Sequence, residues 1–274
     1  AHMDDIARMG AERERARSEL AVASRIQLSA LPTVRPPFSG CDDFGLSASM
    51  HPAKEVGGDF YDFFLIDQDH CGVVIADVSG KGVPAALFMM RVKALLNQLL
   101  REDLSPDQVL ARANDGLCED NEAGMFVTVW LGGLDLRSGK LVYANGGHNP
   151  PLYRHADGSV EWMRDRSGLL LGSFEGVPYR VFERTMIRGD SLILYTDGVT
   201  EAMDASDHCY GDERLFQLVE RECDGYPASV SGVIEEDVRA FAEGADQADD
   251  ITLLVLRYDG QENGPAASAA GNRG

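Results

Sequence analysis

The chain has 274 residues, 44% of them hydrophobic, which is enough for one or two globular domains with a substantial core. Its 25 basic and 45 acidic residues give a formal net charge of −20, which disfavours nucleic acid or an anionic membrane as partner because phosphate neutralisation needs clustered Lys and Arg. No apolar run approaches the roughly 18 to 20 residues of a membrane helix, no export signal is visible, and scattered cysteines without a Cys-x-x-Cys pair indicate reduced thiols in a cytoplasmic protein.

The N-terminal part of the chain predicts one long helix. Residues 1–3 look like a cloning remnant and are set aside. Residues 4–31 lack proline, contain no glycine after Gly10, and place apolar side chains at three-to-four spacing. We interpret 4–31 as a helical linker and a candidate dimerisation or regulatory segment, with a merely solvated helix as the alternative. A proline-rich stretch at 32–37 ends the helix, and a globular domain is expected over 40–258.

The globular part predicts a mixture of strands and helices. Alternation from Phe44 to Met50 indicates a strand open on one face, and the apolar run at 71–76 indicates a strand buried on both faces. Helices are expected from Pro84 and from the capping box at 105–108. Hairpin-linked strands are expected at 126–131, 140–144, 152–154, 160–163, 179–187 and 191–195, helices at 212–223 and 227–243, and a last strand at 251–258. The composition of the tail at 259–274 predicts disorder.

Aspartates recur where strands meet glycines or turns. Asp59 follows Gly57-Gly58, Asp77 ends an apolar run, and the pairs Asp197-Gly198 and Asp249-Asp250 adjoin later strands. Each motif alone is compatible with a tight turn whose aspartate binds nearby amides. Aspartate is unfavourable in strands, so four such corners call for a shared reason. Two divalent cations supply one, because their charge balances about four carboxylates that otherwise repel one another, and Mg²⁺ and Mn²⁺ prefer oxygen ligands.

Together the motifs resemble the metal-dependent serine/threonine protein phosphatases of type 2C (PPM), most closely the bacterial branch typified by SpoIIE and RsbU. The resemblance covers about residues 40–258 and follows the family's order through five motifs: Glu55-Val-Gly-Gly-Asp-Phe-Tyr-Asp62, Ala76-Asp-Val-Ser-Gly-Lys-Gly82, Asn145-Gly-Gly-His-Asn-Pro-Pro151, Tyr195-Thr-Asp-Gly-Val199 and Asp249-Asp-Ile-Thr252. It implies an α+β fold, an αββα sandwich of two antiparallel sheets flanked by helices, here preceded by the long N-terminal helix.

The resemblance also implies the ligands of two divalent cations, Mn²⁺ or Mg²⁺. Asp77 would bridge both cations, and Asp59 would bind directly or through water. The remaining ligands would be the backbone carbonyl of Val78, Asp197 and Asp249, with Asp250 as the alternative to Asp249.

The implied activity is hydrolysis of phosphoserine or phosphothreonine on a protein by metal-activated water, without a phosphoenzyme. In this branch the substrate is commonly an anti-anti-sigma (STAS-type) regulator of stress-response signalling. A catalytically silent docking module of the same fold and a small-phosphoester phosphatase are the alternatives. We further expect the chain to be a catalytic fragment of a longer sensor protein.

Two departures from the family pattern concern groups that would act on the substrate. Ser79 stands where many type 2C enzymes carry a histidine as candidate acid for the leaving group. The arginine that binds phosphate in those enzymes has no clear counterpart, and Lys54 is a candidate substitute. The motif histidine, His148, is interpreted as holding a turn through backbone hydrogen bonds, and Lys81 as capping its loop.

Overall fold

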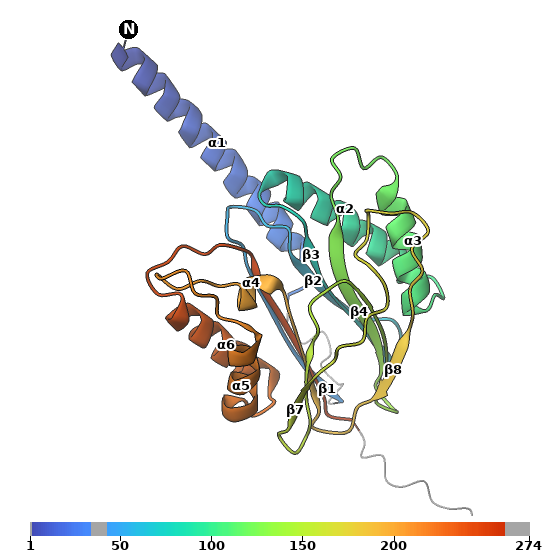
Figure 1. Ribbon diagram of the computed structural model, residues 1–274. Helices are drawn as coiled ribbons and strands as arrows, with labels where there is room; N and C mark the ends of the chain where they lie inside the picture. The colour runs from blue at the N-terminus through green and yellow to red at the C-terminus, as the bar shows by residue number, and fades with distance from the viewer. Residues whose placement is uncertain (1, 34–42, 261–274) are drawn as a thin grey trace, which may run out of the picture.

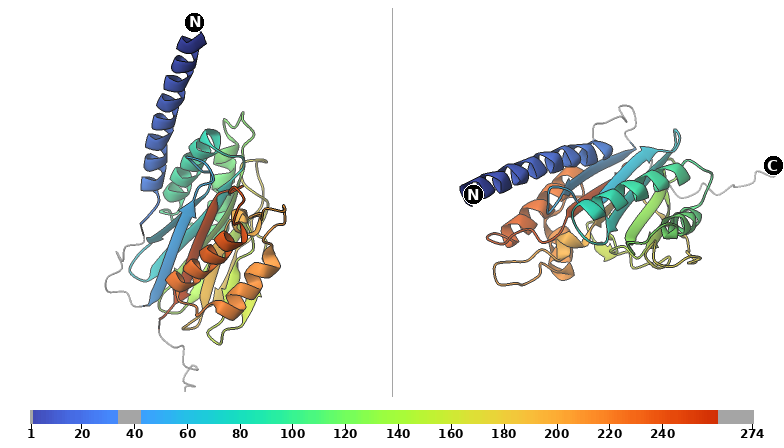
Figure 2. Two further views of the ribbon diagram at one scale, coloured as in Figure 1. Left: turned by 90° about the vertical axis from the view of Figure 1, so that its left-hand side faces the viewer. Right: turned by 90° about the horizontal axis from the view of Figure 1, so that it is seen from above.

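Two antiparallel sheets form the centre of the computed structural model, which describes residues 2–33 and 43–260 (Figures 1 and 2). The first five-stranded sheet has the order β1 (Phe44–His51), β10 (Ile251–Tyr258), β9 (Ser191–Tyr195), β6 (Leu152–Arg154) and β7 (Val160–Trp162). The second has the order β2 (Phe60–Leu65), β3 (His70–Val78), β4 (Val127–Asp135), β5 (Lys140–Gly146) and β8 (Phe182–Thr185). Each pairing within these two sheets is antiparallel, which confirms the predicted αββα architecture.

Four helices cover the outer faces of the sandwich. Helices α2 (Val83–Leu99) and α3 (Pro106–Cys118) pack on the second sheet, and α5 (Asp212–Glu222) and α6 (Pro227–Phe241) pack on the first. Helix α2 has proline in its first turn, and α3 begins with the predicted capping box at Ser105. The helix starts that the sequence predicts are therefore confirmed.

The alternation of side chains along the strands divides the core into two parts. On β9, Leu192 and Leu194 join the main cluster, which fills the space between the sheets and beneath α2 and α3. Ile193 and Tyr195 point the other way, into the smaller cluster beneath α5 and α6. Because neighbouring strand residues face opposite sides, one apolar run supplies both clusters.

Three local expectations need correction. Asp59 does not end a strand: Gly57-Gly58 come first, and β2, which the sequence did not predict, follows directly. The chain also forms a single-turn helix, α4 (Asp197–Thr200), which was not expected. The strand predicted at 179–187 is shortened to β8, because only Phe182–Thr185 pairs with β5.

Helix α1 (His2–Ala30) projects away from the body of the protein, as Figure 1 shows, while its C-terminal end is anchored to it. Gln27 is buried against residues of the globular domain, and Leu31, just beyond the helix, joins the main core. In the described part of the chain, no helix combines the length and apolar character needed to cross a membrane. The tail predicted at 259–274 lies almost wholly outside the described residues, as does most of the 32–37 stretch.

Candidate metal centre

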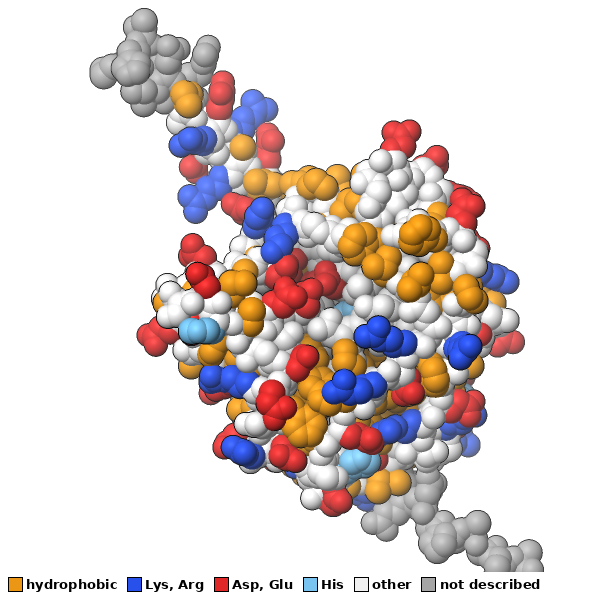
Figure 3. All heavy atoms as spheres, viewed as in Figure 1, with side chains coloured by type: hydrophobic (Ala, Val, Ile, Leu, Met, Phe, Trp, Pro, Cys, Tyr) orange, Lys and Arg blue, Asp and Glu red, His pale blue; other side chains and the backbone are white. Residues whose placement is uncertain are grey.

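The aspartates of four separate motifs meet at one end of the sandwich. Asp59 lies immediately before β2, and Asp77 is the penultimate residue of its antiparallel neighbour β3. Asp197 follows β9, and the pair Asp249-Asp250 precedes β10, which is antiparallel to β9. In antiparallel neighbours the end of one strand lies beside the start of the next, so this topology collects all four corners. Figure 3 shows acidic side chains gathered in a hollow of this face, with basic side chains beside them.

Asp59 is the most deeply buried of these carboxylates. The hydroxyls of Thr196 and Thr252 donate hydrogen bonds to its Oδ2, at 2.6 and 2.8 Å. These threonines stand beside β9 and on β10, so the carboxylate of one sheet is held by hydroxyls of the other. Burial, followed by repulsion from Asp77, raises the pKa of Asp59 well above its usual value.

Asp77 and Asp197 have raised pKa values for the same physical reasons. Burial, the negative charge of Asp197 and that of Asp249 raise the pKa of Asp77 to about 7, against the effect of a hydrogen bond with Asp59. Burial, Glu201 and Asp249 raise the pKa of Asp197 to about 6. Mutual repulsion therefore accompanies desolvation at both carboxylates, and a bound cation would relieve the repulsion.

The adjacent aspartates before β10 have different surroundings. The carboxylate of Asp250 is buried and accepts the backbone N–H groups of Ala53 at 2.8 Å and Gly58 at 2.6 Å. Asp249 is partly exposed, and its Oδ2 lies 2.8 Å from Lys81 Nζ. Asp250 thus fastens the loop that leads to Asp59, whereas Asp249 pairs with an exposed lysine and accepts the Asp250 N–H through Oδ1 at 2.9 Å.

Two glycines are required here for close approach. A Cβ at Gly57 would lie 2.3 Å from Asp250 Oδ2, and a Cβ at Gly198 would lie 1.9 Å from the Asp250 carbonyl oxygen. Both distances are far inside van der Waals contact, so any side chain at either position would push Asp250 away. The Gly-Gly-Asp and Asp-Gly motifs are therefore explained by packing of the loops against the segment before β10.

The residues expected to act on a substrate are placed around this centre. Lys54 is exposed, and its aliphatic stem passes near Gly82. Ser79 Oγ accepts the Phe126 N–H at 3.0 Å and so braces the loop after β3. The Lys81 ammonium donates to the Ala248 carbonyl at 2.5 Å besides pairing with Asp249, a link between two loops that the sequence reasoning missed.

His148 holds a turn, in agreement with its interpretation from the sequence. Its backbone N–H donates to Asn145 Oδ1 at 2.7 Å, and Asn145 Nδ2 donates to the His148 carbonyl at 3.0 Å. Its Nδ1 lies 2.8 Å from the Thr128 hydroxyl. Burial lowers the pKa of His148 to about 4, so the ring is neutral at physiological pH.

The donor set suits a hard divalent cation. It consists of carboxylate oxygens, with no sulfur or imidazole among them, and its charges repel. The Val78 carbonyl lies close to this set, since a Cβ at Gly58 would be 2.9 Å from its oxygen. Within the two described ranges, no three His, Cys, Asp or Glu side chains already have the spacing of a finished ligand set.

Residues 67–259 match the family model described as stage II sporulation protein E (SpoIIE). Over 241 residues the chain is 29% identical to phosphoserine phosphatase RsbU of Bacillus subtilis (strain 168), a match that covers 88% of this chain and 70% of RsbU. Two further curated relatives are 28% identical, and the matches cover 41% and 57% of their length. The chain thus spans only about half of those longer relatives.

Solved structures share the fold. The SiaA-PP2C domain of Pseudomonas aeruginosa superposes with a TM-score of 0.80 at 22% identity, covering 90% of this chain and 99% of that domain. The catalytic domain of the serine/threonine protein phosphatase PstP, solved in complex with 2 manganese ions, has a TM-score of 0.56 at 15% identity and covers 78% of this chain and 98% of that one. At these identities the likeness establishes the architecture.

Proposed function

The chain belongs to the SpoIIE family of PP2C-type phosphatase domains, and on that premise we propose that it hydrolyses phosphoserine or phosphothreonine on a protein with the help of divalent cations. One observation carries the proposal: four sequence-distant aspartate motifs converge on one end of the sandwich, where burial and mutual repulsion raise the pKa values of Asp59, Asp77 and Asp197. The likeness to a phosphoserine phosphatase, RsbU, supports the choice of phosphoester.

Mn²⁺ or Mg²⁺ ions, two of them in the proposal, would supply Lewis-acid activation of water and would neutralise charge on the phosphoryl group. Asp77 is the proposed bridging ligand, and Asp59 is held ready by the hydroxyls of Thr196 and Thr252. The other proposed ligands are Asp197, Asp249 and the Val78 carbonyl. We favour Asp249 over Asp250, because both oxygens of the buried Asp250 accept backbone N–H groups, whereas Asp249 accepts one N–H through Oδ1 and its Oδ2 pairs with the exposed ammonium of Lys81, which a metal cation can displace.

Lys54 remains the proposed phosphate-binding cation, supported by its exposed position beside the Gly80–Gly82 loop. Ser79 does not replace the expected leaving-group acid, because an aliphatic hydroxyl does not titrate near neutral pH, and its oxygen instead braces the loop by accepting a backbone N–H. The proposed substrate is a phosphorylated STAS-type regulator, the class implied by the sequence motifs.

The direct test measures phosphate release from a phosphoserine protein in Mn²⁺, in EDTA and in the Asp77→Asn variant. The proposal expects turnover in Mn²⁺ and its loss under both other conditions. Activity that persists in EDTA would eliminate the metal mechanism. Mn²⁺ binding without turnover on any phosphoester would favour the silent docking module, and turnover of small esters alone would favour the small-phosphoester enzyme.

We also propose that α1 carries a regulatory or dimerisation contact. The end of the helix touches the catalytic domain at Gly57, two residues before Asp59. Farther along it, Val22 and Ile26 leave 43% and 60% of their surface exposed, an apolar stripe that a second helix would cover. Removing residues 4–31 should change both the oligomeric state and the rate of phosphate release, and a truncated chain unchanged in both would refute this contact.

A further inference from the structure

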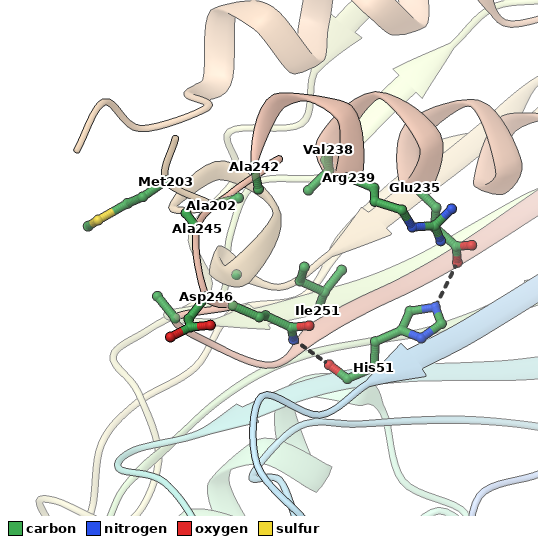
Figure 4. Close-up of a pocket in the computed structure, with 13 residues that line it drawn as sticks. His51, Ala202, Met203, Glu235, Val238, Arg239, Ala242, Ala245, Asp246 and Ile251 are labelled. Carbon is green, nitrogen blue, oxygen red and sulfur yellow. Dashed lines mark hydrogen bonds and ion pairs between the residues drawn. The ribbon is translucent and has the colours of Figure 1, made fainter. Parts of the chain in front are cut away.

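A pocket of about 260 Å³ opens directly beside the acidic centre, between α6 and the loops after β9 and before β10 (Figure 4). Its walls are largely aliphatic and are formed by Ala202, Met203, Val238, Ala242, Ala245 and Ile251. Its volume lies below the roughly 300 to 1,000 Å³ that cofactors and drug-sized ligands occupy. The pocket is therefore suited to a single side chain.

Charged groups stand at two places in an otherwise mostly apolar lining: His51, Glu235 and Arg239 at one end, and Asp246 near the opposite end (Figure 4). His51 Nε2 lies 3.4 Å from Glu235 Oε1. His51 and Glu235 therefore partner each other at that end, and the aliphatic side chains between the two ends are left to contact an entering group. At the opposite end Met203 is 38% exposed, and its flexible thioether can adapt to an entering side chain.

The position of the pocket points to the substrate as its occupant. Gly198, which directly follows Asp197, and Ala248, which directly precedes Asp249, both line it. Two loops thus contribute neighbouring residues to the pocket and to the acidic centre. An extended peptide advances about 3.3 Å per residue and points alternate side chains the same way. A phosphoserine at the acidic centre would bring the side chain two positions away to the pocket mouth.

We propose that this pocket is a specificity subsite that binds an aliphatic side chain located two residues from the phosphorylated serine of the protein substrate. The inference rests on the proposed phosphatase function and adds to it a sequence preference around the phosphoserine. The residues changed in its test, Ala242 and Met203, take no part in the metal centre itself.

The test uses the full chain with Mn²⁺ and a series of phosphoserine peptides in which one leucine is moved through about four positions on either side of the phosphoserine in a Gly/Asn background. Filling the pocket with Ala242→Phe, at the C-terminal end of α6, is compared with Ala240→Phe, the same change at an exposed position in the last turn of that helix. A second variant, Met203→Ala, removes a contact from the pocket wall and introduces no larger side chain that could disturb folding. Hydrolysis of p-nitrophenyl phosphate, which has no peptide, reports on the metal centre alone.

The subsite predicts that leucine at one position two residues from the phosphoserine raises kcat/KM about tenfold, as burial of one aliphatic side chain should. Ala242→Phe should abolish this preference and leave p-nitrophenyl phosphate hydrolysis unchanged, Ala240→Phe should keep it, and Met203→Ala should reduce it severalfold. Equal rates for all peptides would overturn the subsite alone.

Three other results would also overturn the subsite. The first is a leucine preference that survives Ala242→Phe. The second applies if Ala242→Phe does not fold, and it is a leucine preference that Met203→Ala leaves unchanged. The third is dissociation of a dimer by Ala242→Phe, which would assign the pocket to a second copy of the chain. No turnover of any peptide or of p-nitrophenyl phosphate would instead refute the phosphatase function on which the subsite rests.

Discussion

The contact between Gln27 and Gly57 couples the N-terminal helix to the loop that carries Asp59, and replacing Gln27 by leucine should break that coupling. The side-chain amide donates to the Gly57 carbonyl at 2.5 Å and accepts the Gly57 N–H at 3.1 Å. Gln27 is only 4% exposed, and Gly57 is buried. Leucine preserves the bulk and removes both partners, so two backbone groups are left unsatisfied away from water.

A buried polar group that loses its partner costs about 1 to 3 kcal/mol, so the two groups of Gly57 set an expected loss of about 2 to 6 kcal/mol. The loss has an upper limit, because the end of α1 can undock and let water reach Gly57 once the cost exceeds the docking free energy. Gln27→Glu should cost at least as much as Gln27→Leu, since it buries a carboxylate against the Gly57 carbonyl oxygen close to the acidic centre.

Urea unfolding gives the free energy, and amide hydrogen exchange over residues 55–62 reports whether the Asp59 loop opens. We expect a lower unfolding free energy and faster exchange in Gln27→Leu, with Arg25→Leu, an exposed change on the same helix, within about 0.5 kcal/mol of wild type. If Gln27→Leu matched Arg25→Leu in both measurements, the inferred coupling would be wrong.

Three further predictions follow from charged groups. Lys93→Met leaves the buried Asp62 carboxylate without its cation and should lower the free energy of urea unfolding by about 3 to 5 kcal/mol, most of which Lys93→Met combined with Asp62→Leu should restore; an unchanged midpoint would contradict this. Burial lowers the pKa of His148 from 6.5 to about 4, so between these two pH values the imidazole is protonated in the unfolded chain but neutral in the folded one. The free energy of unfolding should therefore fall by about 3 kcal/mol as the pH drops from 6.5 to about 4. Thermal unfolding of His148→Gln over the same pH range should lack this loss. Lys81→Met removes a partly exposed cation beside Asp249, so calorimetry should show Mn²⁺ binding about two- to fivefold tighter, and weaker binding would refute the competition.

The elements with a clear period were predictable, and those without one were not. The capping box of α3 and the hydrophobic alternation of β1 appear in the sequence because their causes are local. Strand β2 lacks a clear alternation of polar and apolar residues, because it carries the buried Asp62. The Asp62 carboxylate is stabilised by Lys93, which lies on α2, 31 residues later in the chain. Helix α4 spans one turn, too short for a 3.6-residue repeat to register.

The acidic corners were predictable for an energetic reason. Which of Asp249 and Asp250 binds the loop of Asp59, and which is the proposed metal ligand, was not predictable. An aspartate beside a strand is unfavourable, so its repetition is a signal in the sequence itself. Adjacent residues at the start of a strand point to opposite sides, so one of the pair had to turn inward. The choice depends on the N–H groups of Ala53 and Gly58, almost two hundred residues earlier, and on the space that Gly57 leaves for the Asp250 carboxylate. Asp250 is therefore committed to holding the Asp59 loop in place, whereas Asp249 accepts one backbone N–H and otherwise pairs with the exposed Lys81, so a metal cation reaches Asp249 by displacing a surface ion pair.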